Sequence, residues 1–210
     1  MKVFFDIFIF FKNKGLCLLN RTFLNLLLFD IDVDPWHING TYFCRKYKMI
    51  AVKEINHLKP SLFIDIGCGL GEVVSRIKIP KNKRYGLDVD SRLEQAIKRV
   101  NPSKFNFFTS REALINSARL NLGKKNGPIV ISLLGFTHTL TEKELLENLN
   151  FFLRELGPYI LVIDAKEPSQ RSDSHINLFE RQEGIIKLLK KIDQIRSLYF
   201  IDLSISPINR

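Results

Sequence analysis

The chain has 210 residues, enough for one domain with a substantial core, and it shows no internal repeat or long low-complexity tract. Hydrophobic residues make up 45% and charged residues 26%, which excludes a disordered or fibrous chain. The formal net charge of +10 comes from basic residues spread along the sequence, so a solvated basic face is favoured over a dedicated nucleic-acid patch.

Residues 1–33 form an apolar N-terminal extension. The runs "VFFDIFIFF" (3–11) and "LCLLNRTFLNLLLF" (16–29) are each shorter than the ~20 apolar residues that a membrane-spanning helix needs, and no small-residue cleavage site follows them. Two alternatives remain open: helices that pack on the main domain, or a segment that lies on a membrane surface with its lysines toward the lipid headgroups. Packing is favoured, and the main domain is expected to cover 34–210.

From residue 60 onward, strand and helix patterns alternate. Capping boxes at Ser91–Glu94 and Thr141–Glu144 are expected to open two of the helices. Repeated strand–helix units with short links predict a doubly wound, Rossmann-like α/β fold: a mostly parallel sheet with helices on both faces. The expected strands are 61–67, 84–90, 105–110, 128–135, 159–165 and 197–205, and the expected helices begin near 91, 112 and 141 and cover 177–192.

The stretch "LFIDIGCGLGE" (62–72) places three alternating glycines directly after the first strand of this unit. In doubly wound folds, ligands bind beyond the carboxyl ends of the strands, where such a turn lies. The dinucleotide fingerprint G-x-G-x-x-G fails here because its last position is Glu72, and a carboxylate there would repel a pyrophosphate. No GK[ST] follows, which excludes a P-loop. Asp65 adds a second negative charge, so a ligand with cationic groups is favoured.

The glycine turn resembles the first motif of class I S-adenosylmethionine-dependent methyltransferases. That motif is an acidic residue, one spacer and alternating glycines, matched by Asp65, Gly67, Gly69 and Gly71. Their second motif, an acidic residue at the end of the next strand, is matched by Asp88. A carboxylate at that point can accept hydrogen bonds from both ribose hydroxyls. The resemblance implies S-adenosyl-L-methionine as the cofactor and methyl transfer as the reaction.

Two further residues are assigned to the cofactor site. Cys68, inside the turn, is expected to contribute a backbone contact only. Ser110, at the end of the third strand, occupies the usual adenine-side position, where many relatives have Asp.

Three more segments resemble methyltransferases of small molecules and sugars, and in particular those of bacterial surface-polysaccharide clusters. They are the lead-in "DPWHINGTYFCRKYKM" (34–49), the segment after the fourth strand, and "SDSHINLF" (172–179). The implied acceptor is a small molecule or glycan, and O-methylation is favoured. A nucleic-acid methyltransferase is the first alternative, although the Asn/Asp-Pro-Pro-aromatic motif is absent. A non-catalytic subunit that keeps the fold is the second.

A hydroxyl acceptor loses a proton as it attacks, so a nearby base is expected. His138 follows the fourth strand and is the favoured base or acceptor-orienting residue, with His175 as its rival and Asp164 as a residue that orients either. His37 is expected either to line the pocket or to pack. No metal site is predicted.

The three cysteines, Cys17, Cys44 and Cys68, show no close pairing, which predicts neither a disulfide framework nor a zinc site. A cytoplasmic location follows, with attachment to the inner face of the membrane as the alternative. The C-terminal end shows the pattern of only one strand, whereas this class of methyltransferase usually ends in an antiparallel pair.

Overall fold

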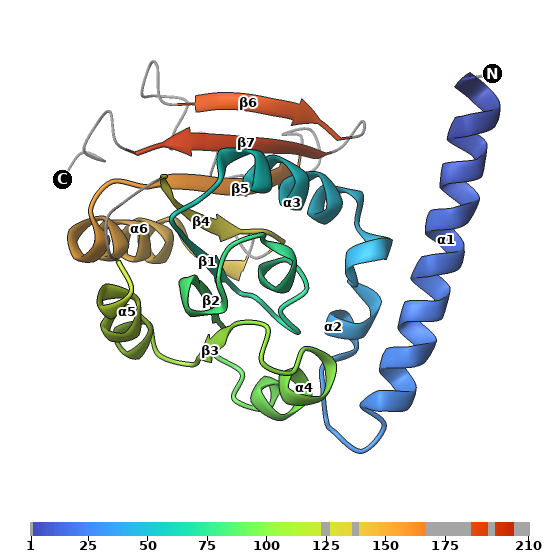
Figure 1. The fold of residues 1–210 in the computed structure, drawn as a ribbon, viewed down its shortest axis with the longest axis horizontal. Helices are drawn as coiled ribbons and strands as arrows, with labels where there is room; N and C mark the ends of the chain where they lie inside the picture. Colours follow the sequence, from blue (N-terminus) through green and yellow to red (C-terminus); the bar gives the residue numbers. More distant parts are fainter. Residues whose placement is uncertain (1, 123–126, 136–138, 167–185, 193–195, 204–210) are drawn as a thin grey trace.

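The protein is described by a computed structural model that covers residues 2–122, 127–135, 139–166, 186–192 and 196–203 (Figure 1). A seven-stranded sheet forms its centre, in the order β3-β2-β1-β4-β5-β7-β6. The first five strands of this order are parallel, and β7 pairs antiparallel with both β5 and β6. The predicted doubly wound α/β fold is confirmed. The strands are β1 (Leu62–Ile66), β2 (Arg84–Leu87), β3 (Asn106–Phe108), β4 (Ile129–Leu133), β5 (Ile160–Lys166), β6 (Ile186–Lys191) and β7 (Arg196–Asp202).

Helices cover both faces of the sheet, as Figure 1 shows. On one face, α5 (Arg111–Leu120) and α6 (Glu142–Leu156) bury their apolar sides against the strands. On the other face, α3 (Lys46–Leu58) and α4 (Leu93–Val100) form a second buried cluster. The buried strands β1 and β4 contribute side chains to both clusters, as expected for a parallel sheet that is covered on two sides.

One of the two predicted capping boxes is present. Thr141 and Glu144 cap each other reciprocally at the start of α6. The box predicted at Ser91–Glu94 is wrong, because α4 begins at Leu93 without a side-chain cap. The carboxylate of Asp90 instead accepts a hydrogen bond from the backbone N–H of Arg92. Asp90, the residue before Ser91, therefore stabilises the turn that precedes α4.

The helix predicted at 177–192 is wrong over 186–191, which form β6; residues 177–185 lie outside the described part of the chain. β6 pairs with β7 through an irregular register, and this pairing satisfies the backbone groups on that edge of β7. The antiparallel terminal pair, which the sequence pattern showed only in part, is therefore complete.

The N-terminal extension is one continuous helix, α1 (Lys2–Leu27), which runs along one side of the domain (Figure 1). Leu24, Leu28 and Val33 are buried in the same cluster as α3, so the predicted packing on the main domain is confirmed for this part of the extension. Within the described residues, no helix combines the length and the apolar character that crossing a bilayer requires.

Candidate functional site

The glycine turn is tied to the end of the neighbouring strand β2. The backbone N–H groups of Gly67 and Cys68 both donate to the carbonyl of Leu87, at 2.8 and 3.1 Å. The N–H of Gly69 donates to Oδ2 of Asp88 at 3.0 Å, and the N–H of Asp90 donates to Oδ1 of Asp88 at 3.2 Å. The turn and the carboxylate therefore form one hydrogen-bonded unit. It leads into a short 3-10 helix, η2 (Val74–Arg76).

A pocket of about 410 Å³ opens beside this unit, at the carboxyl ends of β1, β2 and β4. Its walls come from three places: the glycine turn with Asp88, the residues just after β4, and the lead-in segment before α3. The lining residues are Asp34, Trp36, His37, Gly40, Tyr47, Lys48, Gly67, Cys68, Gly69, Leu70, Glu72, Asp88, Leu134, Gly135 and Thr139.

Four of the cofactor residues predicted from the sequence meet in this pocket: Gly67, Cys68, Gly69 and Asp88. The thiol of Cys68 is fully buried, and burial raises its pKa, which agrees with a residue that offers its backbone and not a reactive sulfur.

Three other predicted residues lie outside the pocket wall. Gly71 packs against the ring of Phe105. Ser110 is exposed and caps α5, where its hydroxyl accepts from the N–H of Ala113, so the structure does not place its side chain on the pocket. Asp65 is buried in β1. Their parts in cofactor binding stay predictions.

The two predicted catalytic histidines, His138 and His175, lie outside the described residues. Their roles therefore remain predictions as well. His37 lines the pocket, and its ring lies against Gly69: a Cβ added to that glycine would come within 2.7 Å of His37 Nδ1. The bare backbone of Gly69 is thus required for the close approach of the imidazole.

The carboxyl group of Asp65 is fully buried, and Ser132 donates a hydrogen bond to its Oδ1 at 2.6 Å. Burial raises the pKa of Asp65 to about 7, while the hydrogen bond from Ser132 opposes the shift. Asp65 therefore joins β1 to Ser132 of β4 and carries a proton in mildly acidic solution. It is not the second negative charge at the pocket that its position in the motif suggested.

This raised pKa makes stability depend on pH. Between about pH 4 and pH 7 the folded protein holds a proton on Asp65 that the unfolded chain has lost. The stabilisation is complete below this range and is lost as the pH rises through the folded pKa. We expect the free energy of unfolding of the wild type, relative to Asp65→Asn, to fall from pH 4 to pH 7 and to level off above. Urea unfolding at a series of pH values measures it, and a constant difference would contradict the assignment.

The lead-in segment forms a second wall of the pocket. Asp34 caps the short helix α2 (Pro35–Asn39) by accepting from the N–H of Trp36 at 2.8 Å. The guanidinium of Arg45 lies 4.5 Å from the centre of the Trp36 ring. Asp34, Trp36 and His37 of this segment line the pocket.

Lys48 is a pocket residue that the sequence reasoning missed. Its Nζ donates to the carbonyl of Gly40 at 2.7 Å and to Oε2 of Glu72 at 3.1 Å. Glu72 is buried, and a buried carboxylate needs a cation, which Lys48 supplies. The burial of Glu72 is visible only in the structure, so the sequence held no signal for this contact. Tyr47, one residue before Lys48, also lines the pocket.

Behind Tyr47 lies a polar network that joins three strands to α3. Asp164, on β5, accepts from the N–H of Gly135 at 2.5 Å and pairs with Nη1 of Arg196, on β7, at 2.5 Å. The Arg196 guanidinium stacks 4.4 Å from the ring centre of Tyr47, and burial raises the pKa of Tyr47 to about 12. Asp164, predicted to orient a histidine, thus holds the backbone after β4 and anchors Arg196.

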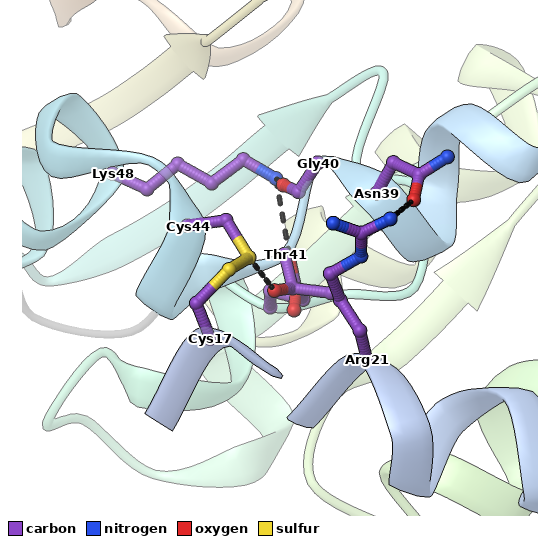
Figure 2. Close-up of a disulfide and its surroundings, with 8 residues drawn as sticks. Cys17, Arg21, Asn39, Gly40, Thr41, Cys44 and Lys48 are labelled. Atoms are coloured by element: carbon purple, nitrogen blue, oxygen red, sulfur yellow. Dashed lines mark hydrogen bonds and ion pairs between the residues drawn. A yellow bond between two sulfur atoms is a disulfide. The ribbon is translucent and has the colours of Figure 1, made fainter. Parts of the chain in front are cut away.

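A disulfide joins Cys17 of α1 to Cys44 of η1 (Tyr42–Cys44), so the prediction of no disulfide is wrong (Figure 2). The two residues are 27 positions apart, but α1 folds back along the lead-in segment and brings their Cα atoms to 4.9 Å. Arg21 adds a hydrogen bond to the side chain of Asn39, and the Thr41 hydroxyl lies 2.9 Å from Cys44 Sγ. The predicted cytoplasmic location was based on unpaired cysteines, and the disulfide removes that basis.

Reduction of this disulfide is expected to lower the free energy of unfolding by about 3 kcal/mol, because the loop that it closes gains freedom in the unfolded chain. Urea unfolding with and without reductant measures the effect, and Cys17→Ser supplies a protein on which the reductant has no such effect. Thiol titration of the unreduced, unfolded chain is expected to find one free cysteine, Cys68. Three free thiols in that titration would show that the disulfide is absent.

Neither a protein-family model nor a curated protein matches the sequence. Solved structures do match. The N-methyltransferase NodS from Bradyrhizobium japonicum WM9, crystallised with S-adenosyl-L-homocysteine, is 13% identical over 88% of this chain and 98% of its own, with a TM-score of 0.56. The methyltransferase domain of bacterial CtHen1 is 15% identical over 75% and 98%, with a TM-score of 0.54. The bifunctional kinase-methyltransferase WbdD is 17% identical over 85% of this chain and 46% of its own, with a TM-score of 0.56. At such low identity the likeness is one of fold, and the fold of this chain is that of solved methyltransferases.

Proposed function

We propose that this protein is an S-adenosylmethionine-dependent methyltransferase that acts on a small molecule or a glycan. The observation that carries the proposal is the shared wall of one pocket, where the Asp88 carboxylate and the backbone of Gly67–Gly69 lie side by side. The presence of S-adenosyl-L-homocysteine in the NodS crystal supports the choice of cofactor, because NodS has the same fold.

The residues of the pocket fit this cofactor. Each oxygen of Asp88 accepts one backbone N–H and has a further lone pair, which suits the two ribose hydroxyls. Glu72 and Asp34 add negative charge to the lining, and Lys48 is paired with Glu72. This balance favours a ligand with an ammonium and a sulfonium over one with phosphates. When bound, S-adenosylmethionine supplies a methyl group on a positively charged sulfur.

The chain's own task in such a reaction is to hold the acceptor in line and to exclude water. Leu134 and Gly135 follow β4, and Tyr47 lies beside them in the pocket wall. In the sheet, β4 is separated by β1 from β2, the strand that Asp88 follows. We therefore assign the acceptor to the β4 side of the pocket. His138 is the proposed base and His175 its rival. A base of this kind typically contributes ~10²–10⁴-fold.

The acceptor class rests on the resemblance of 34–49 and 172–179 to methyltransferases of surface-polysaccharide clusters. O-methylation is the favoured outcome, although the name of NodS specifies an N-methyltransferase. Hydroxylated and amino sugars are therefore both assay substrates. Tight cofactor binding without turnover on any acceptor would favour the non-catalytic alternative.

Calorimetric titration with S-adenosyl-L-homocysteine tests the cofactor site. We expect Asp88→Ala to weaken binding by about 1–3 kcal/mol, because the ribose hydroxyls lose a charged acceptor. Asp32→Ala is the control, since Asp32 is an exposed carboxylate that pairs with Arg92 away from the pocket lining. Trp36 is the chain's single tryptophan and lines the pocket, so its fluorescence gives a second readout. Equal affinity of the Asp88→Ala protein and the wild type would overturn the site.

A further inference from the structure

Exposed apolar side chains are concentrated at the end of α1. The described residues expose eight large hydrophobic side chains, and five of them lie within 18–29, on the last turns of α1 and directly after it. Their exposed fractions run from 58% to 84%. A concentration of this kind marks an interaction surface, whereas single exposed apolar residues are ordinary. We call this set the outer α1 face: Leu18, Leu19, Phe23, Leu26 and Phe29.

Helix geometry separates this face from the side that packs on the domain. Leu24 and Leu28 are buried and four residues apart, and the disulfide at Cys17 secures the same side about two turns earlier. Leu19 and Phe23 are also four apart, but they point away from the domain and are exposed. The domain therefore fixes α1 on one side and leaves an apolar side open to an external partner.

The charge of α1 and of the whole chain is positive. The sequence of α1 holds the basic residues Lys2, Lys12, Lys14 and Arg21 and one acidic residue, Asp6, and the chain has a net charge of +10. Arg21 faces the domain, where it hydrogen-bonds to Asn39. The first acidic residues after the helix, Asp30 and Asp32, are paired with Arg99 and Arg92. An apolar helix face on a basic protein suits a surface that is apolar inside and anionic at its rim.

We propose that the outer α1 face binds an anionic lipid bilayer, with α1 lying in the plane of the membrane surface. The apolar side chains enter the headgroup–acyl boundary, and the positive charge of the chain is attracted to the anionic headgroups. A second copy of the chain is the other occupant to consider. Two copies, each with a net charge of +10, would repel each other, so the lipid surface is favoured. The proposal is independent of methyl transfer.

Vesicle co-sedimentation of the full chain tests the proposal. The probes are vesicles of phosphatidylcholine alone and of phosphatidylcholine with phosphatidylglycerol. We expect binding to the anionic vesicles that weakens in high salt, and much weaker binding to the neutral ones. The double variant Leu18→Gln/Leu26→Gln is expected to lose at least about tenfold in partitioning, because two exposed leucines no longer enter the bilayer.

Leu120→Gln is the matched control, since Leu120 is an exposed leucine on α5 and is 87% accessible. It is expected to bind like the wild type. The emission of Trp36 and a thermal melt verify that every variant is folded. The proposal is overturned if the wild type ignores anionic vesicles, or if the double variant binds them as the wild type does. Sedimentation equilibrium completes the test: a wild-type dimer that the double variant loses, without vesicle binding, would assign the face to a second copy.

Discussion

Replacement of Arg196 by methionine is expected to lower the free energy of unfolding by about 3–5 kcal/mol, because it removes one partner of a buried ion pair. Asp164 is buried, and its Oδ2 lies 2.5 Å from Arg196 Nη1. The other oxygen of Asp164 already accepts from Gly135. The substitution also removes the guanidinium that stacks on Tyr47, so the pocket wall beside β4 is expected to loosen with it.

Urea unfolding measures this loss, and Arg154→Met is the matched control. Arg154 also pairs with a carboxylate, that of Glu155, and also stacks near a ring, that of Phe151, but its side chain is 70% exposed. An exposed pair of this kind contributes about 0–1 kcal/mol. The double variant Arg196→Met/Asp164→Asn should recover part of the stability, since it no longer buries a charge. If the two arginine variants lose the same amount, burial of Asp164 is not the cause.

The parallel part of the fold could be predicted from the sequence because its strands are continuous apolar runs that end at glycine or acidic residues. β1 and β4, buried on both faces, show this pattern most clearly. β6 could not be predicted in the same way. Its sequence "IKLLKK" carries three lysines and suits either a helix or an edge strand, and pairing with β7 makes it a strand.

The candidate site was predictable only where local sequence decides the geometry. The positive φ angles and close approaches of the turn demand glycine, so Gly67 and Gly69 could be recognised from their spacing, and Asp88 from its place after β2. The contribution of Lys48 depends on a contact with Glu72, 24 residues later, which no local pattern reveals. The same holds for the disulfide, which depends on α1 folding back along the lead-in segment.

Substitution of Gly71 by alanine is expected to cost about 3–5 kcal/mol of stability. Gly71 has φ = 74°, a left-handed conformation that costs a residue with a Cβ about 1–2 kcal/mol. An added Cβ would also lie 2.1 Å from Cζ of Phe105, and relief of this overlap adds about 2–3 kcal/mol. The ring has no room to retreat, because its other edge lies against Gly86, where a Cβ would be 2.7 Å away. Phe105 is thus held in a slot between two glycines.

Gly15→Ala is the control for this substitution, since Gly15 lies in α1 with nothing within 4 Å of an added Cβ. It is expected to stabilise the protein by about 0.5–1 kcal/mol, because alanine favours the helix. A double-mutant cycle with Phe105→Ala separates the two causes of the Gly71 effect. In the Phe105→Ala background, Gly71→Ala should cost only the backbone part, about 1–2 kcal/mol. An undiminished cost in that background would show that the ring does not fill the slot, and the packing that holds the glycine turn in place would need another source.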